Sequence, residues 1–200
     1  MKKALFLLLA LALITPTAAL KAQDDETWIN YKIVDDAKSP NVDMTFKYPG
    51  KYQVGVNSDP GVVRDFNYVD EERSLLSNLV ISNFQLEEGM LAPFYIAEQK
   101  KWDDQGLLGL FQTLSEDMKG IQKTNFSYHK NNPSYDLYVR LDFPDNSGLV
   151  LYSDIKFVIY KNSILKFECG LVGRSQEVDA AFARSDEEVC LPFFAGLNFE

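Results

Sequence analysis

The chain has 200 residues, of which 46% are hydrophobic, and a formal net charge of −9 at pH 7. This acidic balance argues against nucleic acid or an anionic lipid surface as a partner, because both require clustered lysine and arginine. Two cysteines and a single histidine leave few ligands for a zinc site. The length suits one domain with a hydrophobic core of its own.

Residues 1–22 have the three parts of a secretory signal peptide. Two lysines follow the initial methionine, residues 4–14 are an unbroken apolar run, and small residues come after it. This run is too short to cross a bilayer as a helix, which needs about 20 residues. We therefore predict cleavage after Ala22, with Ala19 as the alternative, and export to the periplasm or the extracellular space.

Cleavage after Ala22 removes three lysines and changes the formal charge from −9 to −12. Residues 23–200 contain no second long apolar run, internal repeat or low-complexity linker. We expect a single domain over 23–200, with its core at about 40–199 and no membrane span in the mature chain.

Alternating apolar and polar residues predict several strands in the first half of the chain. These are an edge strand at 28–34, a tight hairpin of 44–48 with 52–56, and two strands at 62–69 and 76–84. Leu79, Val80 and Ile81 are apolar at successive positions, so this strand is expected to be central and covered on both faces.

Helical spacing appears in the middle of the chain. Apolar residues recur every three or four positions and predict a helix that ends near Gly120, with an N-cap at Asp103 or Asp104. The stripe comprises Leu107, Leu110, Phe111, Leu114 and Met118. Residues 93–102 are expected to form an earlier helix, bent from the next near Gly106.

The second half is predicted to contain a three-stranded antiparallel meander, because short turns join its strands. The strands are 136–143, 149–159 and 165–171, and the turns are 144–148 and 161–163. A last helical stretch covers 177–183 and is expected to resume over 186–195, where Ser185 would cap it and Pro192 favours an early end. Strands on both sides of a helical region, with a terminal helix, indicate the α+β class.

Cys169 falls on the apolar face of the last predicted strand, and Cys190 falls in the last helix. A helix packed on a preceding strand can bring two Cα atoms within the ~4.4–6.8 Å that a disulfide requires. Because exported proteins meet an oxidising compartment, we expect a structural disulfide here rather than two buried thiols.

The sequence contains few of the residue patterns that common catalytic mechanisms require. His129, the single histidine, lies beside a predicted turn and is expected to be a solvated surface residue. Nucleophile-elbow and phosphate-loop patterns are absent. Acidic clusters at predicted turns and helix starts are expected to be solvated, although two carboxylates across a cleft could hydrolyse a glycan. These clusters are 35–36, 70–72, 87–88, 103–104 and 186–188. We predict no catalytic, metal or cofactor site.

Several aromatic residues around the first predicted hairpin are candidates for lining a binding groove, with burial in the core as the alternative. They are Tyr48, Tyr52, Phe66 and Tyr68, together with Phe46.

Three further features occur in a recognisable order. Segment 44–49 (MTFKYP) is an aromatic strand ending in Tyr-Pro, a helical region separates the early strands from the late meander, and segment 193–199 (FFAGLNF) closes the chain after the last helix. This arrangement resembles the PsbP-like fold family over about residues 40–199. The resemblance implies a three-layer αβα sandwich around a predominantly antiparallel sheet. The family includes the photosystem II extrinsic subunit, a Ran-binding nuclear transport factor and bacterial envelope relatives, which are mostly non-catalytic.

The leading hypothesis from the sequence is an exported, non-enzymatic binding or accessory protein of the bacterial envelope. Its partner would be another envelope protein or an unidentified ligand. Two alternatives stay open, namely a glycan hydrolase that uses acidic residues alone and a carrier of an apolar small molecule that uses the aromatic residues.

Overall fold

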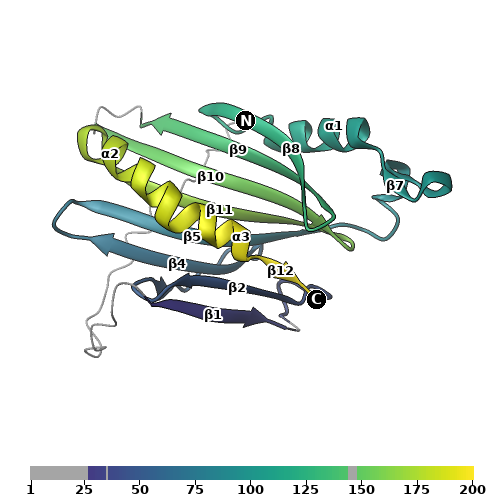
Figure 1. Ribbon diagram of the computed structural model, residues 1–200, viewed down its shortest axis with the longest axis horizontal. Helices are drawn as coiled ribbons and strands as arrows, with labels where there is room; N and C mark the ends of the chain where they lie inside the picture. Colours follow the sequence, from purple (N-terminus) through teal and green to yellow (C-terminus); the bar gives the residue numbers. More distant parts are fainter. Residues whose placement is uncertain (1–26, 35, 144–147) are drawn as a thin grey trace.

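The computed structural model describes residues 27–34, 36–143 and 148–200. The predicted signal peptide, its cleavage position and most of the turn at 144–148 lie outside these residues. A seven-stranded main sheet runs through the centre of the molecule in the order β3-β4-β5-β11-β10-β9-β8 (Figure 1). Its strands are β3 Gln53–Val54, β4 Val62–Asp70, β5 Leu75–Gln85, β8 Ile121–His129, β9 Asn132–Asp142, β10 Leu149–Tyr160 and β11 Ser163–Arg174.

Every neighbouring pair in the main sheet is antiparallel, and the late meander β9-β10-β11 is confirmed. β5 lies between β4 and β11, so it is central as predicted. Leu79 and Ile81 are buried on one face of β5, whereas Val80 on the other face is only half-buried. β8 is missing from the predicted strands, because an edge strand with mostly exposed or half-buried side chains has a polar sequence that conceals the alternation.

A separate small sheet has three strands in the order β1-β2-β12. They are β1 Trp28–Ile33, β2 Met44–Pro49 and β12 Asn198–Phe199. The predicted hairpin of 44–48 with 52–56 is therefore wrong, because β2 pairs with β1 and β12 whereas β3 pairs with β4. The turn between them exists, with the Tyr52 amide donating to the Pro49 carbonyl at 3.0 Å, but it leads the chain from the small sheet into the main sheet.

Helix α1, Asp104–Ser115, packs on one face of the main sheet. Leu107 and Phe111 of its apolar stripe are fully buried against β9 and β10. Asp103 takes the N-cap position as predicted. The helix ends at Ser115, earlier than the expected end near Gly120, and the Ser115 hydroxyl donates to the Phe111 carbonyl at 3.0 Å.

The earlier helix predicted at 93–102 is wrong. Two 3-10 turns, η1 Ala92–Phe94 and η2 Ala97–Gln99, alternate with the two short strands β6 Tyr95–Ile96 and β7 Lys101–Trp102. The rings of Tyr95 and Trp102 pack across this ladder with centroids 5.4 Å apart. Lys100 has a left-handed backbone (φ 51°), which prevents the second turn from continuing as a helix.

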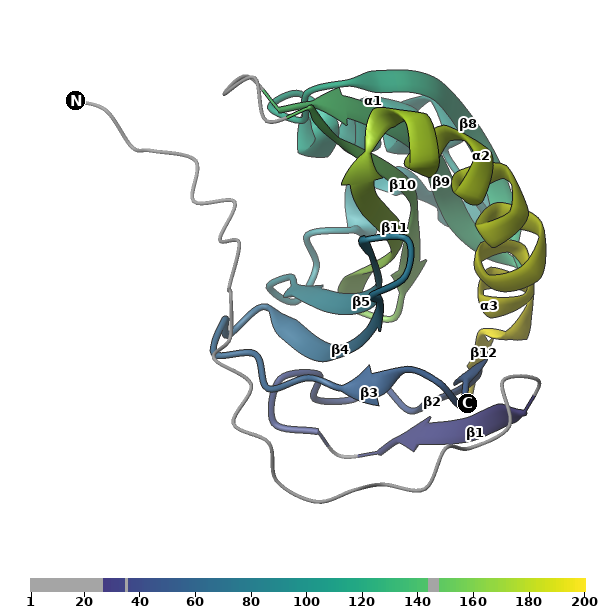
Figure 2. The same cartoon turned by 90° about the vertical axis from the view of Figure 1, so that its left-hand side faces the viewer.

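One uninterrupted helical segment, which we call the C-terminal helix, crosses the opposite face of the main sheet (Figures 1 and 2). It consists of α2 Ser175–Ser185, the π-helical turn η3 Asp186–Cys190 and α3 Leu191–Gly196. The predicted restart with a cap at Ser185 is wrong, because Ser185 has helical angles (φ −62°, ψ −36°). Pro192 does not end the segment early. It lies in the first turn of α3, directly after the wider π-helical turn, where a residue without an N–H group is tolerated.

Helix α1, the main sheet and the C-terminal helix form the three layers of the predicted sandwich. The small sheet covers the same face as the C-terminal helix, and Phe193 of α3 contacts Phe46 of β2 at 5.9 Å between ring centroids. Odd-numbered residues of β9 and β10 face α1, so the polar even-numbered residues such as Asp136, Tyr138 and Asp154 face the C-terminal helix. Within the described part of the chain, no helix is both long and apolar enough to cross a membrane.

Candidate functional site

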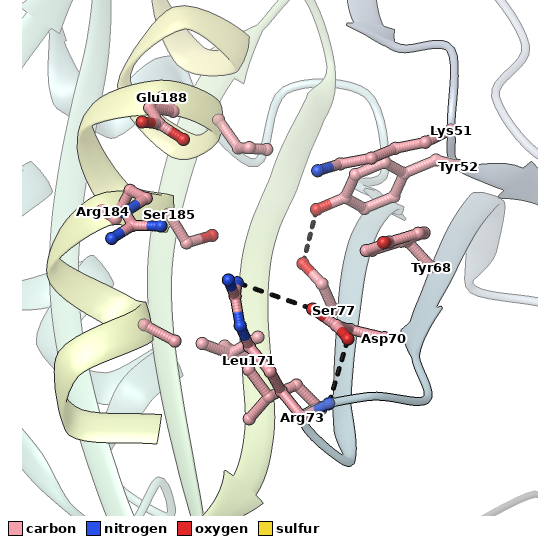
Figure 3. Close-up of a pocket in the computed structure, with 13 residues that line it drawn as sticks. Lys51, Tyr52, Tyr68, Asp70, Arg73, Ser77, Leu171, Arg184, Ser185 and Glu188 are labelled. Atoms are coloured by element: carbon pink, nitrogen blue, oxygen red, sulfur yellow. Dashed lines mark hydrogen bonds and ion pairs between the residues drawn. The ribbon is translucent and has the colours of Figure 1, made fainter. Parts of the chain in front are cut away.

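Two hollows lie on the face of the main sheet that carries the C-terminal helix, one on each side of this helix. The first, the tyrosine cavity, has a volume of about 230 Å³ between the β4–β5 end of the sheet and α2 (Figure 3). The second, the carboxylate groove, has a volume of about 630 Å³ between β8–β10 and α3. The tyrosine cavity includes Lys51, Tyr52, Tyr68, Arg73, Ser77 and Arg184, and the carboxylate groove includes His129, Asp136, Asp154, Lys156, Asp186 and Phe194.

The five predicted aromatic candidates divide into two groups. Tyr52 and Tyr68 line the tyrosine cavity, with ring centroids 5.8 Å apart. Phe46, Tyr48 and Phe66 instead lie in the core between the two sheets, with exposed fractions of 2%, 7% and 0%. The ring centroids of Tyr48 and Phe66 are 4.4 Å apart. Phe66 and Tyr68 share a face of β4, but the small sheet covers only Phe66 completely. Tyr68 and Tyr52, although Tyr52 is itself only 4% exposed, are thus the candidates that line one of the two hollows.

Tyr52 forms a rigid wall of the tyrosine cavity. Its hydroxyl donates to the Ser77 hydroxyl at 2.5 Å, and Ser77 donates in turn to the Gly170 carbonyl at 3.3 Å. Burial is the main cause that raises the pKa of Tyr52 to about 12, so the phenol stays neutral at physiological pH. The ring is thus held in one position, and the small part of it that is not covered by protein is uncharged.

Three cations surround this wall, and all three are missing from the sequence-based candidates. Lys51 comes from the turn before β3, Arg73 from the β4–β5 turn and Arg184 from the last turn of α2. Figure 3 shows the Lys51 ammonium and the Arg73 guanidinium pointing toward the middle of the cavity. Lys51 Nζ lies 4.7 Å from the Tyr68 ring centroid, and Arg73 lies 3.6 Å from the Asp70 carboxylate. No local motif links these residues, because they come from three distant segments.

A pair of carboxylates marks the carboxylate groove. Oxygen atoms of Asp154 on β10 and Asp186 in η3 lie within 4.8 Å of each other. Burial, together with a hydrogen bond to Asp186 and its charge, raises the pKa of Asp154 to about 7. The expectation that cluster 186–188 is a solvated turn is therefore wrong for Asp186, which faces the sheet because the helix continues through η3.

This pair does not by itself form a metal site. The third potential ligand within 4.8 Å is the sulfur of Cys190, which is bonded to Cys169 and is therefore no thiolate. The two remaining carboxylates are fewer donors than the four of a structural zinc site or the six to eight of a calcium site. What the pair can do chemically is hold and release a proton near neutral pH.

His129 and the Asp136–Lys156 ion pair occupy the other end of the carboxylate groove. The structure corrects the expectation that His129 is a solvated surface residue, since His129 is half-buried at the end of β8. Its Nε2 donates to the Leu197 carbonyl at 3.0 Å, and burial lowers its pKa. Lys130 donates to the same carbonyl at 2.7 Å. His129 therefore anchors the end of the chain beside α3.

The expected disulfide is present and joins the middle of β11 to the end of η3. The Cα atoms of Cys169 and Cys190 are 5.5 Å apart, and both residues are buried. η3 lies between the two hollows, so the position of the helix at this point determines the width of both hollows. The disulfide fixes the C-terminal helix at this point. The sequence identified this bond, but it gave no indication of its place between two hollows.

Neither family models nor curated proteins match the sequence. Solved structures do resemble the fold. The PsbP of Synechocystis sp. PCC 6803 (CyanoP) is 12% identical, with 93% of this chain and 100% of that chain covered and a TM-score of 0.53. LpqN of Mycobacterium tuberculosis is 8% identical (88% and 92% covered, TM-score 0.48), and the Saccharomyces cerevisiae Ran-binding protein Mog1p is 8% identical (86% and 95% covered, TM-score 0.46). At 12% identity the likeness to CyanoP concerns the fold alone, and it agrees with the element order and the antiparallel sheet described above: this chain has the PsbP-like fold.

Proposed function

We propose that this chain is an exported, non-enzymatic binding or accessory protein of the bacterial envelope. The pattern of residues 1–22 and a buried disulfide support export, because disulfides persist in oxidising compartments. Its partner would be another envelope protein or a small ligand.

One observation carries the binding role: two open hollows flank a helix that a disulfide attaches to the sheet. Hollows lined by both apolar and charged side chains on rigid elements are typical of preformed binding sites. Ala181 of α2 lines the tyrosine cavity and Ala195 of α3 lines the carboxylate groove, so each hollow can be filled separately.

Chemical crosslinking and native mass spectrometry of the exported protein test this proposal. We expect a specific partner or ligand in the wild-type protein, lost in Ala181→Trp or in Ala195→Trp but retained in Ala180→Trp, a change at an exposed position of α2. The mass of the purified chain should correspond to residues 23–200, or to 20–200 if cleavage follows Ala19. Retention of the uncleaved chain in the cytoplasm, or identical capture by all variants, would contradict the proposal.

A glycan hydrolase is the second candidate, and the Asp154–Asp186 pair favours it. A carboxyl with a pKa near 7 can act as a general acid at neutral pH, and a neighbouring carboxylate can act as its partner. Screening the exported protein on envelope polysaccharides decides between the two. Turnover that disappears in Asp154→Asn and in Asp186→Asn, with Asp117→Asn unaffected, would establish the hydrolase and refute a purely binding role.

A further inference from the structure

The tyrosine cavity combines positive charge with an aromatic wall in a protein that is otherwise acidic. We propose that this cavity binds a small organic anion, with a carboxylate or phosphate group held by Lys51 and Arg184 and an apolar body packed on Tyr52 and Tyr68. The inference rests on the proposed binding function and adds to it the place and the chemical class of the ligand.

The charges around the cavity favour an anion. Lys51, Arg73 and Arg184 outnumber the carboxylates Asp70 and Glu188, although the whole chain has a net charge of −9. Asp70 is already paired with Arg73 at 3.6 Å. Among the described residues, neither Lys51 nor Arg184 has a carboxylate within ion-pair distance. Lys51 and Arg184 are thus free of close ion pairs within this part of the chain, and with Glu188 counted the lining keeps an excess of one positive charge for an anionic group.

The walls favour a ligand with an apolar or aromatic body. Tyr52 and Tyr68 stand along one side, and Leu75, Leu171 and Val189 supply buried apolar surface. A planar ring can pack against tyrosine rings held at this spacing. The volume of about 230 Å³ lies below the roughly 300–1,000 Å³ of sites for drug-sized molecules, so the ligand must be small.

The cavity is built before any ligand arrives. The hydrogen bonds from Tyr52 to Ser77 and from Ser77 to the Gly170 carbonyl fix the aromatic wall on β5 and β11. On the opposite side, Arg184 and Ser185 belong to a helix that the Cys190 disulfide holds five residues further on. Figure 3 shows the Ser185 hydroxyl directed into the cavity, where it can donate to an anionic oxygen. Fixed groups of this kind reduce the entropy lost on binding.

Calorimetric titration of the exported protein with four probes that share a phenyl ring and differ in head group tests the ligand class. Phenyl phosphate and benzoate are the anionic probes, benzyl alcohol is neutral and benzylamine is cationic. We expect the anions to bind and benzylamine not to bind, and the stronger of the two anions identifies the head group. Lys51→Gln and Arg184→Gln should each weaken anion binding by about tenfold or more, because each removes a charged contact. Added salt should weaken it as well.

Lys119→Gln is the matched control, because Lys119 is exposed on the connection between α1 and β8. It should bind as the wild-type protein does, and all variants should unfold at the same temperature. Equal affinity for benzyl alcohol and the anions would overturn the proposal in favour of an apolar-ligand carrier. Anion binding that survives Lys51→Gln and Arg184→Gln, or no binding of any probe, would also overturn it. A partner that is still captured through the carboxylate groove would then leave the proposed binding function standing.

Discussion

Replacing Asp154 by asparagine should stabilise the protein at alkaline pH and leave its stability unchanged in acid. Asparagine has the shape of the protonated carboxyl and can still donate a hydrogen bond to Asp186. The wild-type side chain, by contrast, must ionise beside Asp186 in a half-buried position. The variant therefore removes the cost of this charge and keeps the contact.

The magnitude follows from the pKa of Asp154, which rises from the ordinary aspartate value of 3.8 to about 7 in the folded protein. The folded state binds this proton more tightly than the unfolded state, so the associated stability is complete below pH 4 and is lost as the pH rises to 7. The full difference corresponds to about 4 kcal/mol. Because the pair is partly open to water, we expect about half of this, ~2 kcal/mol.

Urea denaturation at pH 4 and at pH 8 measures this difference. We expect the free energy of unfolding of Asp154→Asn to match that of the wild-type protein at pH 4 and to exceed it by ~2 kcal/mol at pH 8. Asp186→Asn should give a smaller gain at pH 8, because it removes the neighbouring charge but leaves the burial that is the main cause of the raised pKa of Asp154. The double variant should add little to Asp154→Asn, because the two residues form one interacting pair. Asp117→Asn, at an exposed position, is the control. An equal difference at both pH values would refute the reasoning.

Three further changes test the packing. Replacing Cys169 and Cys190 together by alanine removes a link between residues 21 positions apart and should lower the free energy of unfolding, measured in urea, by about 3 kcal/mol. Reducing the disulfide should have the same effect. A loss below about 1 kcal/mol would contradict this expectation. Phe111→Ala, on the buried face of α1, should lower the free energy of unfolding by about 3–5 kcal/mol in the same measurement. A change at an exposed position of α1 should lower it by less than about 0.5 kcal/mol. Gly120→Ala should lower the melting temperature more than Gly89→Ala, because both have positive φ (77° and 85°) but only at Gly120 would a Cβ meet a backbone carbonyl, at 2.2 Å.

The sequence predicted well those elements whose periodicity is local. The strands β9 and β10 alternate because one of their faces is buried under α1, and the alternating apolar face of β11 is buried under the small sheet and the C-terminal helix. The stripe of α1 includes the buried residues Leu107 and Phe111. The sequence also predicted the disulfide, because Cys169 and Cys190 lie on a strand and on the helix that packs against it. When one face of a strand or helix is buried, apolar residues recur along the sequence with the period of that element, and this periodicity is visible without coordinates.

The elements that were predicted incorrectly depend on neighbours distant in the chain. A turn after Tyr48 indicates a hairpin, yet the choice of β1 and β12 as partners for β2 depends on how two sheets pack around Phe46 and Phe66. Acidic residues after Ser185 indicate a helix start, yet η3 continues the helix because packing and the disulfide hold it against β11. In both cases tertiary contacts outweigh the local preference.

By itself, then, the sequence determined the α+β class, the antiparallel meander, the covalent link between β11 and the last helix, and two of the aromatic residues that line a cavity. Only the tertiary structure decided that Lys51 and Arg184 line the same cavity as Tyr52, and that Asp154 and Asp186 share a groove. The physical reason is that each of these meetings depends on the position of the C-terminal helix across the sheet. The packing of the whole core sets that position, so it cannot be predicted from any short segment of the sequence.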